Sequence, residues 1–88
     1  MSSCKVLFFA TLKDRVGVRQ STLELPDGIT VRELKVILQE HFPSITPVLP
    51  NALIAVNREY ALDDTLIPPE AEIALFPPVS GGNLMSPG

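Results

Sequence analysis

The stretch TVRELKVILQEHFP, Thr30–Pro43, carries the clearest secondary-structure signal of the chain and predicts one amphipathic helix. Thr30 and Glu33 have the spacing of a capping box, in which each side chain satisfies a backbone N–H group at a helix start. Pro43 ends the helix, because the residue before a proline is pushed out of the helical region. The apolar residues at helical spacing form one face, which consists of Val31, Leu34, Ile37, Leu38 and Phe42.

Short apolar segments on both sides of this helix predict strands, with charged or turn-forming residues between them. They are Cys4–Ala10, Ser21–Leu25, Leu53–Asn57, a short strand around Tyr60, and Glu72–Phe76. We expect one helical turn near Leu12–Val16, a proline-containing loop over Pro43–Leu53, and a tight turn at Asn57 and Arg58.

The order of these elements predicts the fold. One helix with a single apolar face needs one sheet face to cover it, which gives a two-layer α+β domain. If the first two strands form a hairpin and the last strand lies beside the first, the right-handed crossover rule leads to a β-grasp, or ubiquitin-like, fold. We therefore expect a mixed sheet of four to five strands, covered on one face by one main helix.

The first strand is apolar on both of its faces. In a two-residue period Val6 and Phe8 share one face, while Leu7 and Phe9 share the other. A strand covered on one side only does not need a second apolar face. That face is therefore expected either to lie in the core or to meet another protein.

Composition excludes several classes of function. The 88 residues are 45% hydrophobic and form one domain. Cys4 is the only cysteine, so we expect no disulfide and a reduced, cytoplasmic setting. No stretch has the length and apolarity of a membrane helix. The net charge of −3, without a basic patch, argues against a nucleic-acid partner.

The reactive side chains form no catalytic constellation. His41, in the last helical turn, is interpreted as a favourable partner of the helix dipole. Cys4 is interpreted as a small hydrophobe or an exposed terminal residue, and Asp63 and Asp64 as turn formers. We expect no metal site, no bound cofactor and no catalysis by the isolated chain.

The closing stretch FPPVSGGNLMSPG, Phe76–Gly88, offers backbone chemistry instead. A carboxyl group at the end of a tail can be activated as an acyl adenylate without any special side chain. Gly81 and Gly82 lack Cβ, so such a tail could enter a narrow channel and approach ATP closely. The alternative is that the two glycines simply begin a disordered end, and the pair alone leaves both interpretations open.

Three segments together resemble the MoaD family, the ubiquitin-like sulfur carriers that form the small subunit of molybdopterin synthase. They are KVLFFA at Lys5–Ala10, AVN at Ala55–Asn57 and, above all, LFPPVSGG at Leu75–Gly82. The similarity in element order and spacing extends over residues 3 to 82. It implies a carrier that is not catalytic alone and works within a heterotetrameric synthase.

The resemblance also implies a reaction sequence and two partners. An E1-like, MoeB-like enzyme uses ATP to adenylate the terminal glycine, which then becomes a thiocarboxylate. The tail enters a large, MoaE-like subunit, where its sulfur goes to cyclic pyranopterin monophosphate. Two such transfers build the dithiolene of molybdopterin.

By the same resemblance, the residue that carries the acyl adenylate and the thiocarboxylate is Gly82, with Gly81 beside it. Val79 and Ser80 belong to the threaded tail. Pro77 and Pro78 are expected to stiffen its root, because proline fixes φ and reduces the entropy lost on ordering.

The family's hydrophobic partner-binding patch falls on Phe9, Tyr60 and Phe76. Parity along the strands puts Phe9 and Phe76 on the face away from the helix, and aromatic side chains are typical interface anchors. The alternative is that both phenylalanines fill the core.

The chain departs from the family pattern after Gly82, where members of the family normally end. Residues 1–82 are expected to form the carrier domain, and residues 83–88, NLMSPG, an extension. The extension could be removed by a protease, be an expression or reading-frame remnant, begin a fusion, or mark a carrier that binds but cannot be charged. We favour removal or an inert extension, because six extended residues add about 20 Å, too much for Gly88 to replace Gly82.

Two other functions stay open at this point. One is a sulfur carrier of another pathway, such as thiazole, tRNA thiolation or cysteine synthesis, or a protein modifier. The other is a pure interaction module in which Gly81 and Gly82 have no acyl role.

Overall fold

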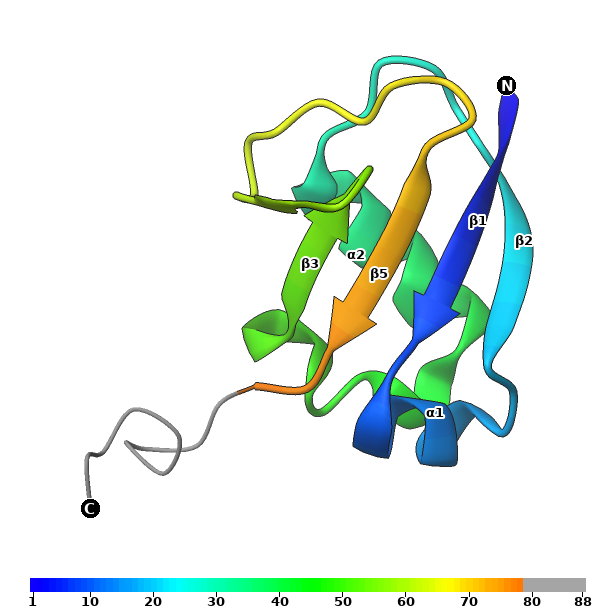
Figure 1. Cartoon of the computed structure of the whole chain (residues 1–88), viewed down its shortest axis with the longest axis vertical. Helices are drawn as coiled ribbons and strands as arrows, with labels where there is room; N and C mark the ends of the chain where they lie inside the picture. Colours follow the sequence, from blue (N-terminus) through cyan, green and yellow to red (C-terminus); the bar gives the residue numbers. More distant parts are fainter. Residues whose placement is uncertain (79–88) are drawn as a thin grey trace.

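The computed structural model describes residues 1–78, which form a mixed five-stranded sheet with its main helix on one face (Figure 1). The strand order is β2-β1-β5-β3-β4, in which β1 and β5 are parallel and the other neighbours are antiparallel. The strands are β1 Ser2–Phe8, β2 Gln20–Leu25, β3 Leu53–Val56, β4 Glu59–Ala61 and β5 Glu72–Phe76. This arrangement confirms the predicted α+β, β-grasp fold.

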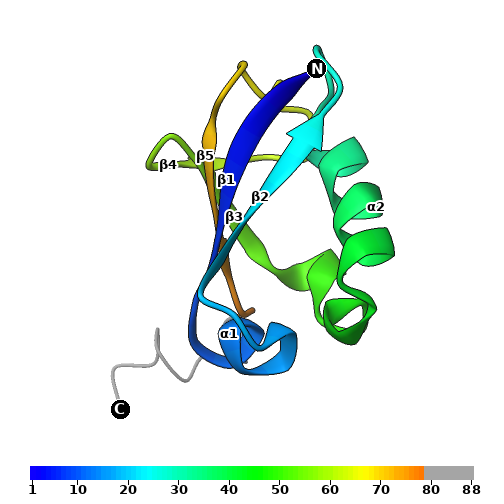
Figure 2. The same cartoon turned by 90° about the vertical axis from the view of Figure 1, so that its right-hand side faces the viewer.

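The main helix, α2, extends over Val31–His41 and begins with the predicted capping box. The Glu33 N–H donates to Thr30 Oγ1 at 3.3 Å, and the Thr30 N–H donates to Glu33 Oε1 at 2.9 Å. Figure 2 shows α2 along one side of the sheet, with the other side uncovered by any helix. The sheet therefore has one face toward the core and one face free for contacts.

The core lies between α2 and the facing side of the sheet. Cys4, Val6 and Phe8 of β1 are buried there, and the Phe8 ring meets Phe42 edge-on with centroids 5.0 Å apart. Cys4 is fully buried, which agrees with its interpretation as a small hydrophobe. The other fully buried large side chains are Leu12, Leu25, Val31, Leu34, Leu38, Ile45, Leu49, Ile73 and Leu75.

The first strand ends two residues earlier than predicted, because the chain turns into a short helix, α1, Ala10–Val16. Leu12 on this helix is fully buried, so α1 packs against the core. Gly17 ends α1 in the left-handed conformation, with φ of 90°, and its N–H donates to the Lys13 carbonyl. Figure 1 shows α1 at the end of the sheet where β5 also ends.

The proline-containing connection after α2 is more ordered than the predicted loop. It holds two 3-10 turns, Pro43–Ile45 and Leu49–Asn51, whose Ile45 and Leu49 are fully buried. Within residues 1–78, neither α1 nor α2 has the length and apolarity needed to cross a membrane.

Candidate functional site

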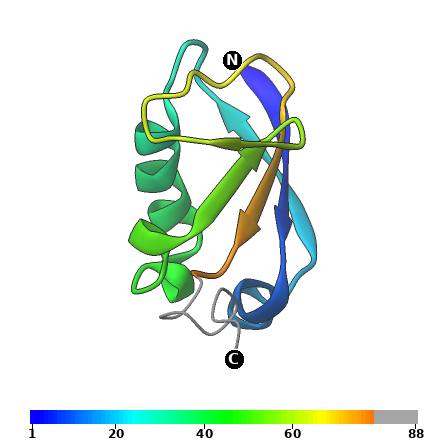
Figure 3. The ribbon, with the colours of Figure 1, turned by 60° about the vertical axis from the view of Figure 1, so that its left-hand side comes forward.

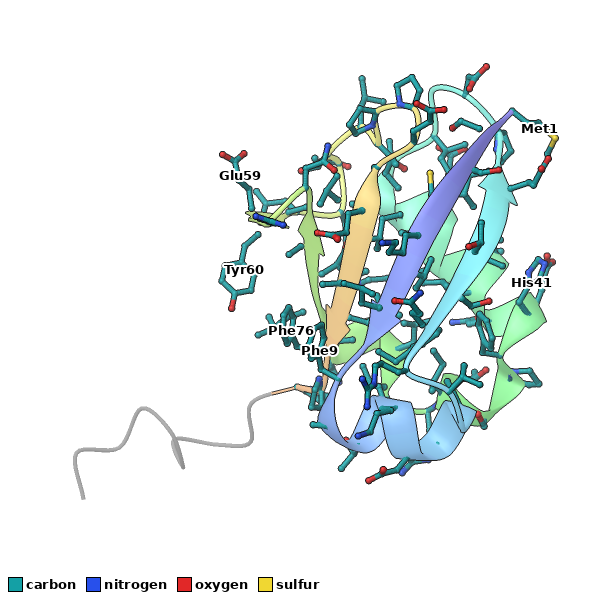
Figure 4. All side chains as sticks on the ribbon, turned by 45° about the vertical axis from the view of Figure 1, so that its right-hand side comes forward. Met1, Phe9, His41, Glu59, Tyr60 and Phe76 are labelled. Atoms are coloured by element: carbon teal, nitrogen blue, oxygen red, sulfur yellow. The ribbon has the colours of Figure 1, made fainter. Side chains whose placement is uncertain are left out.

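Three aromatic side chains come together on the sheet face opposite α2, and we call Phe9, Tyr60 and Phe76 the aromatic patch. The Phe9 and Phe76 rings are stacked, with centroids 4.8 Å apart and planes 11° apart. Tyr60 lies beside them, with its ring centroid 6.2 Å from that of Phe76. Figure 4 shows the three on the same side of the molecule.

The exposure of these rings argues against a role in filling the core. Phe9 is 40% exposed and Tyr60 is 75% exposed, while Phe76 is half-buried. None of the three belongs to the cluster of buried residues between α2 and the sheet. The structure therefore places Phe9 and Phe76 on the predicted face, and their role in binding stays a prediction.

The pairing of β1 with β5 positions the stacked rings. Alternation along β5 puts Ile73 and Leu75 into the core and turns Phe76 toward the opposite face. Phe9 directly follows β1, and its N–H donates to the Leu75 carbonyl at 3.2 Å. This bond holds the end of β1 against the end of β5, so the Phe9 ring lies over Phe76.

A tight turn positions Tyr60. Asn57 and Arg58 have φ of 51° and 72°, as a two-residue hairpin turn requires, and β4 then pairs Tyr60 with Ala55. Asn57 also fastens this hairpin to β5, because its N–H donates to the Glu72 carbonyl at 2.7 Å. Its side-chain Oδ1 accepts the Glu72 N–H at 2.9 Å. The sequence predicted the turn but gave no sign of this link to Glu72.

A shallow depression of about 300 Å³ adjoins the aromatic patch, and we call it the patch depression. Ala55 and Ala74 are direct partners across β3 and β5, so two small side chains leave room beside the larger rings. The Arg58 Nε lies 3.6 Å from Glu72 Oε1 within the lining. The lining residues are Leu7, Phe9, Ala55, Arg58, Tyr60, Glu72, Ala74 and Phe76. Strand alternation placed Leu7 and Ala74 on this face, while Ala55, Arg58 and Glu72 were missed.

The root of the tail adjoins the aromatic patch. Pro77 and Pro78 directly follow Phe76 and are half-buried. The predicted tail residues Val79, Ser80 and Gly81, and Gly82, which is predicted to bear the sulfur, lie outside the described residues.

The other candidate side chains lie apart from this site. His41 is exposed on the opposite side of the molecule (Figure 4), and its Nδ1 lies 3.1 Å from the Ile37 carbonyl oxygen. Asp63 pairs with Lys35 at 3.1 Å, and Asp64 pairs with Arg32 at 2.8 Å, so each aspartate has its own cation. Over residues 1–78 there is no group of three or more His, Cys, Asp or Glu side chains that could hold a metal ion.

Known proteins similar to this chain belong to one family of small carrier proteins. The model of the ThiS family matches residues 6–82. The chain is 37% identical over 78 residues to the molybdopterin synthase sulfur carrier subunit of Arabidopsis thaliana, covering 89% of this chain and 81% of that protein. It is 38% identical over 84 residues to the protein of the same name from Caenorhabditis briggsae, covering 93% of this chain and all of that one.

Solved structures share the fold. SAMP1 from Haloferax volcanii superimposes with a TM-score of 0.78 and 27% identity, covering 92% of this chain and 100% of that one. A chain in the complex of subunits 1 and 2 of the molybdopterin-converting factor from Helicobacter pylori superimposes with a TM-score of 0.64 and 26% identity. That match covers 91% of this chain and 99% of the other.

Proposed function

The chain belongs to the ThiS family, and from this premise we propose that it is the sulfur carrier subunit of a molybdopterin synthase. Its relatives of that name match it over most of their length and most of this chain. The expected location is the cytoplasm, a reducing compartment that suits the free, buried thiol of Cys4.

The observation that carries the proposal is the position of the aromatic patch. Phe76 belongs to the patch and is also the last residue of β5, one residue before Pro77. A partner that binds Phe9 and Phe76 is therefore next to the point where the tail leaves the domain. One protein can then hold the body of the carrier and receive its tail in the same encounter.

The chemistry that we propose takes place at the carboxyl group of Gly82. An E1-like enzyme joins this carboxylate to AMP from ATP and releases pyrophosphate. Hydrosulfide supplied by a sulfur donor then displaces AMP and leaves a thiocarboxylate. In the synthase the sulfur passes to cyclic pyranopterin monophosphate, and water returns the carboxylate. The carrier binds no ATP itself in this scheme, since the activating enzyme uses it.

We propose that the aromatic patch binds the large subunit of the synthase. The Helicobacter pylori structure is a complex of two subunits of the molybdopterin-converting factor, which supports a second subunit as the partner. Phe9 and Tyr60 offer exposed rings beside small alanines, which suits an apolar side chain of the partner. Pro77 and Pro78 reduce the entropy that the tail loses when it is ordered.

The sequence imposes one condition on this function. The carboxyl group of Gly82 is joined to Asn83 in a peptide bond, so it must be released before it can be adenylated. We propose that hydrolysis of the bond between Gly82 and Asn83 precedes charging. Removal of residues 83–88 is then the first step of activation.

Intact-mass measurement tests the proposal. The full chain and a chain ending at Gly82 are incubated with ATP, a sulfur donor and the adenylating enzyme from the same organism. The shortened chain should gain the mass difference between sulfur and oxygen, and the full chain should not. A lack of mass gain in both chains would contradict the carrier function. A charged chain should then convert cyclic pyranopterin monophosphate when the large subunit is present.

A second candidate is a protein modifier. Its support is the similarity to SAMP1, whose other solved structures bear the name small archaeal modifier protein 1. A modifier would form an amide bond between the Gly82 carboxyl group and lysine side chains of other proteins. Mass spectrometry of proteins from cell extracts would then find lysine side chains that carry the residues of this chain ending at Gly82. A pure sulfur carrier would leave no such attachment.

A further inference from the structure

We propose that the large subunit also fills a second depression, on the α2 side of the β4 edge, so that it contacts Tyr60 from two sides. This inference rests on the proposed function, because it extends the same interface. We call this hollow, of about 480 Å³, the edge depression. Its lining residues are Val31, Lys35, Ala52, Leu53, Ile54, Tyr60, Ala61, Leu62 and Asp63. Figure 3 looks onto this edge, with β3 and β4 in front of β5 and α2 to one side.

The edge depression is continuous with the aromatic patch. Tyr60 lines both the edge depression and the patch depression. Leu53, in the lining of the edge depression, is the direct strand partner of Phe76. A partner that holds the tail beyond Phe76 therefore lies beside both depressions, and a single surface of that partner can enter both.

Three apolar side chains around the edge depression are exposed. Leu62 is 79% exposed, Tyr60 is 75% exposed and Leu53 is 40% exposed. Exposed apolar side chains that occur singly need no explanation, but a contiguous group marks an interaction surface. Together with Phe9 they extend the apolar surface from the free sheet face around the β4 edge.

The contacts of Lys35 indicate which group of the large subunit would lie in the edge depression. Its side chain is only 15% exposed, and its Nζ donates to the Pro50 carbonyl at 3.3 Å and to Asp63 Oδ1 at 3.1 Å. A lysine ammonium has three N–H donors, so one remains for an acceptor beyond these two contacts. The matching segment of the large subunit presents an aliphatic side chain to Leu53 and Leu62, with a carbonyl or carboxylate oxygen near Lys35.

Three variants of the chain ending at Gly82 test this inference, since that chain keeps every residue of the fold described above. Leu62→Glu places a charge in the edge depression. Val18→Glu makes the same kind of change at a residue that is 46% exposed and lies before β2, at the opposite edge of the sheet. Phe9→Ala reports on the aromatic patch. Calorimetric titration with the large subunit from the same organism measures the dissociation constant of each variant.

We expect Leu62→Glu to raise the dissociation constant by about tenfold or more, as loss of an interface anchor does, and Val18→Glu to leave it within about twofold. Unchanged binding by Leu62→Glu, with weakened binding by Phe9→Ala, would overturn this inference and leave the proposed function standing. Unchanged binding by both variants would also contradict the proposal that the aromatic patch binds the large subunit. Thermal unfolding should show that all three variants are folded.

Amide hydrogen exchange gives a second measurement that needs no substitution. Binding of the large subunit should slow exchange at Ala61, Leu62 and Asp63 as well as at Phe76. Slower exchange at Phe76 alone would confine the interface to the sheet face and contradict the inference.

Discussion

The rings of Phe9 and Phe76 are stacked, with centroids 4.8 Å apart, although one follows the first strand and the other ends the last. Parallel pairing of β1 with β5 produces this contact. The tail that follows Phe76 is thereby joined to a surface built from both ends of the domain.

Phe9→Ala should weaken binding of the large subunit about tenfold or more, because an exposed aromatic anchor is lost. The free energy of unfolding should fall by about 1–3 kcal/mol, because the aromatic pair and the buried part of the ring are both lost, and the domain should stay folded. Calorimetric titration and urea denaturation measure the two effects, and Val36→Ala is the control, since Val36 is exposed on α2. Loss of the folded state would show that Phe9 is a core residue.

Ala74→Leu should fill part of the patch depression, because Ala74 lines it. Ala74 is half-buried on the free sheet face between Leu7 and Ala55, so a larger side chain there points away from the core. We expect binding of the large subunit to weaken about tenfold while the unfolding temperature stays within a few degrees. Ala74→Ser is the matched control of similar size. Normal binding by Ala74→Leu would contradict the role of this depression.

Asn57→Ala should lower the free energy of unfolding by about 0.5–1.5 kcal/mol, because the exposed hydrogen bond from the Glu72 N–H loses its Asn57 Oδ1 acceptor. The positive φ of Asn57 adds to the loss, since alanine disfavours it. Asn57→Asp keeps both the acceptor and the tolerance of positive φ, so it should restore most of the stability. Urea denaturation measures all three chains, and equal losses in both variants would exclude the side-chain bond as the cause.

Replacement of Pro77 and Pro78 by glycines should weaken binding of the large subunit by about 4- to 30-fold without a change in unfolding temperature. Each proline limits the conformations of the unbound tail, and its loss costs about 0.4–1 kcal/mol in ordering entropy. The effect should be absent for a chain that ends at Pro78, because no tail then enters the partner. Calorimetric titration of four chains checks this expectation. They are the chain with both prolines and the chain with both glycines, each with the tail and each ending at position 78.

The sequence predicted those parts of the fold that depend on neighbouring residues. The capping box of Thr30 and Glu33 and the stop at Pro43 placed α2 correctly, because both signals act within one or two turns. Burial of Ile45 and Leu49 was missed, since prolines suggested a loop and only tertiary packing shows that their side chains enter the core.

In the candidate site, too, the features that depend on neighbouring residues were predicted and those that join distant segments were not. Strand parity was enough to put Phe9 and Phe76 on the free face, because side-chain direction alternates along any strand. The patch depression beside Ala55 and Ala74 could not be predicted, because it forms only where these two small residues face each other across β3 and β5. The bonds between Asn57 and Glu72 also join segments that are distant in the sequence.

The central place of β5 has a consequence for synthesis of the protein. This strand, Glu72–Phe76, lies between β1 and β3, so a chain that stops before it lacks the middle of the sheet. Such a fragment leaves the backbone groups of β1 and β3 without their partner strand and exposes the apolar side chains that Ile73 and Leu75 cover. A truncated copy should therefore be removed by cellular proteases as an unfolded chain. Only copies translated through the last strand should fold, so an incomplete copy should not compete for the proposed partner.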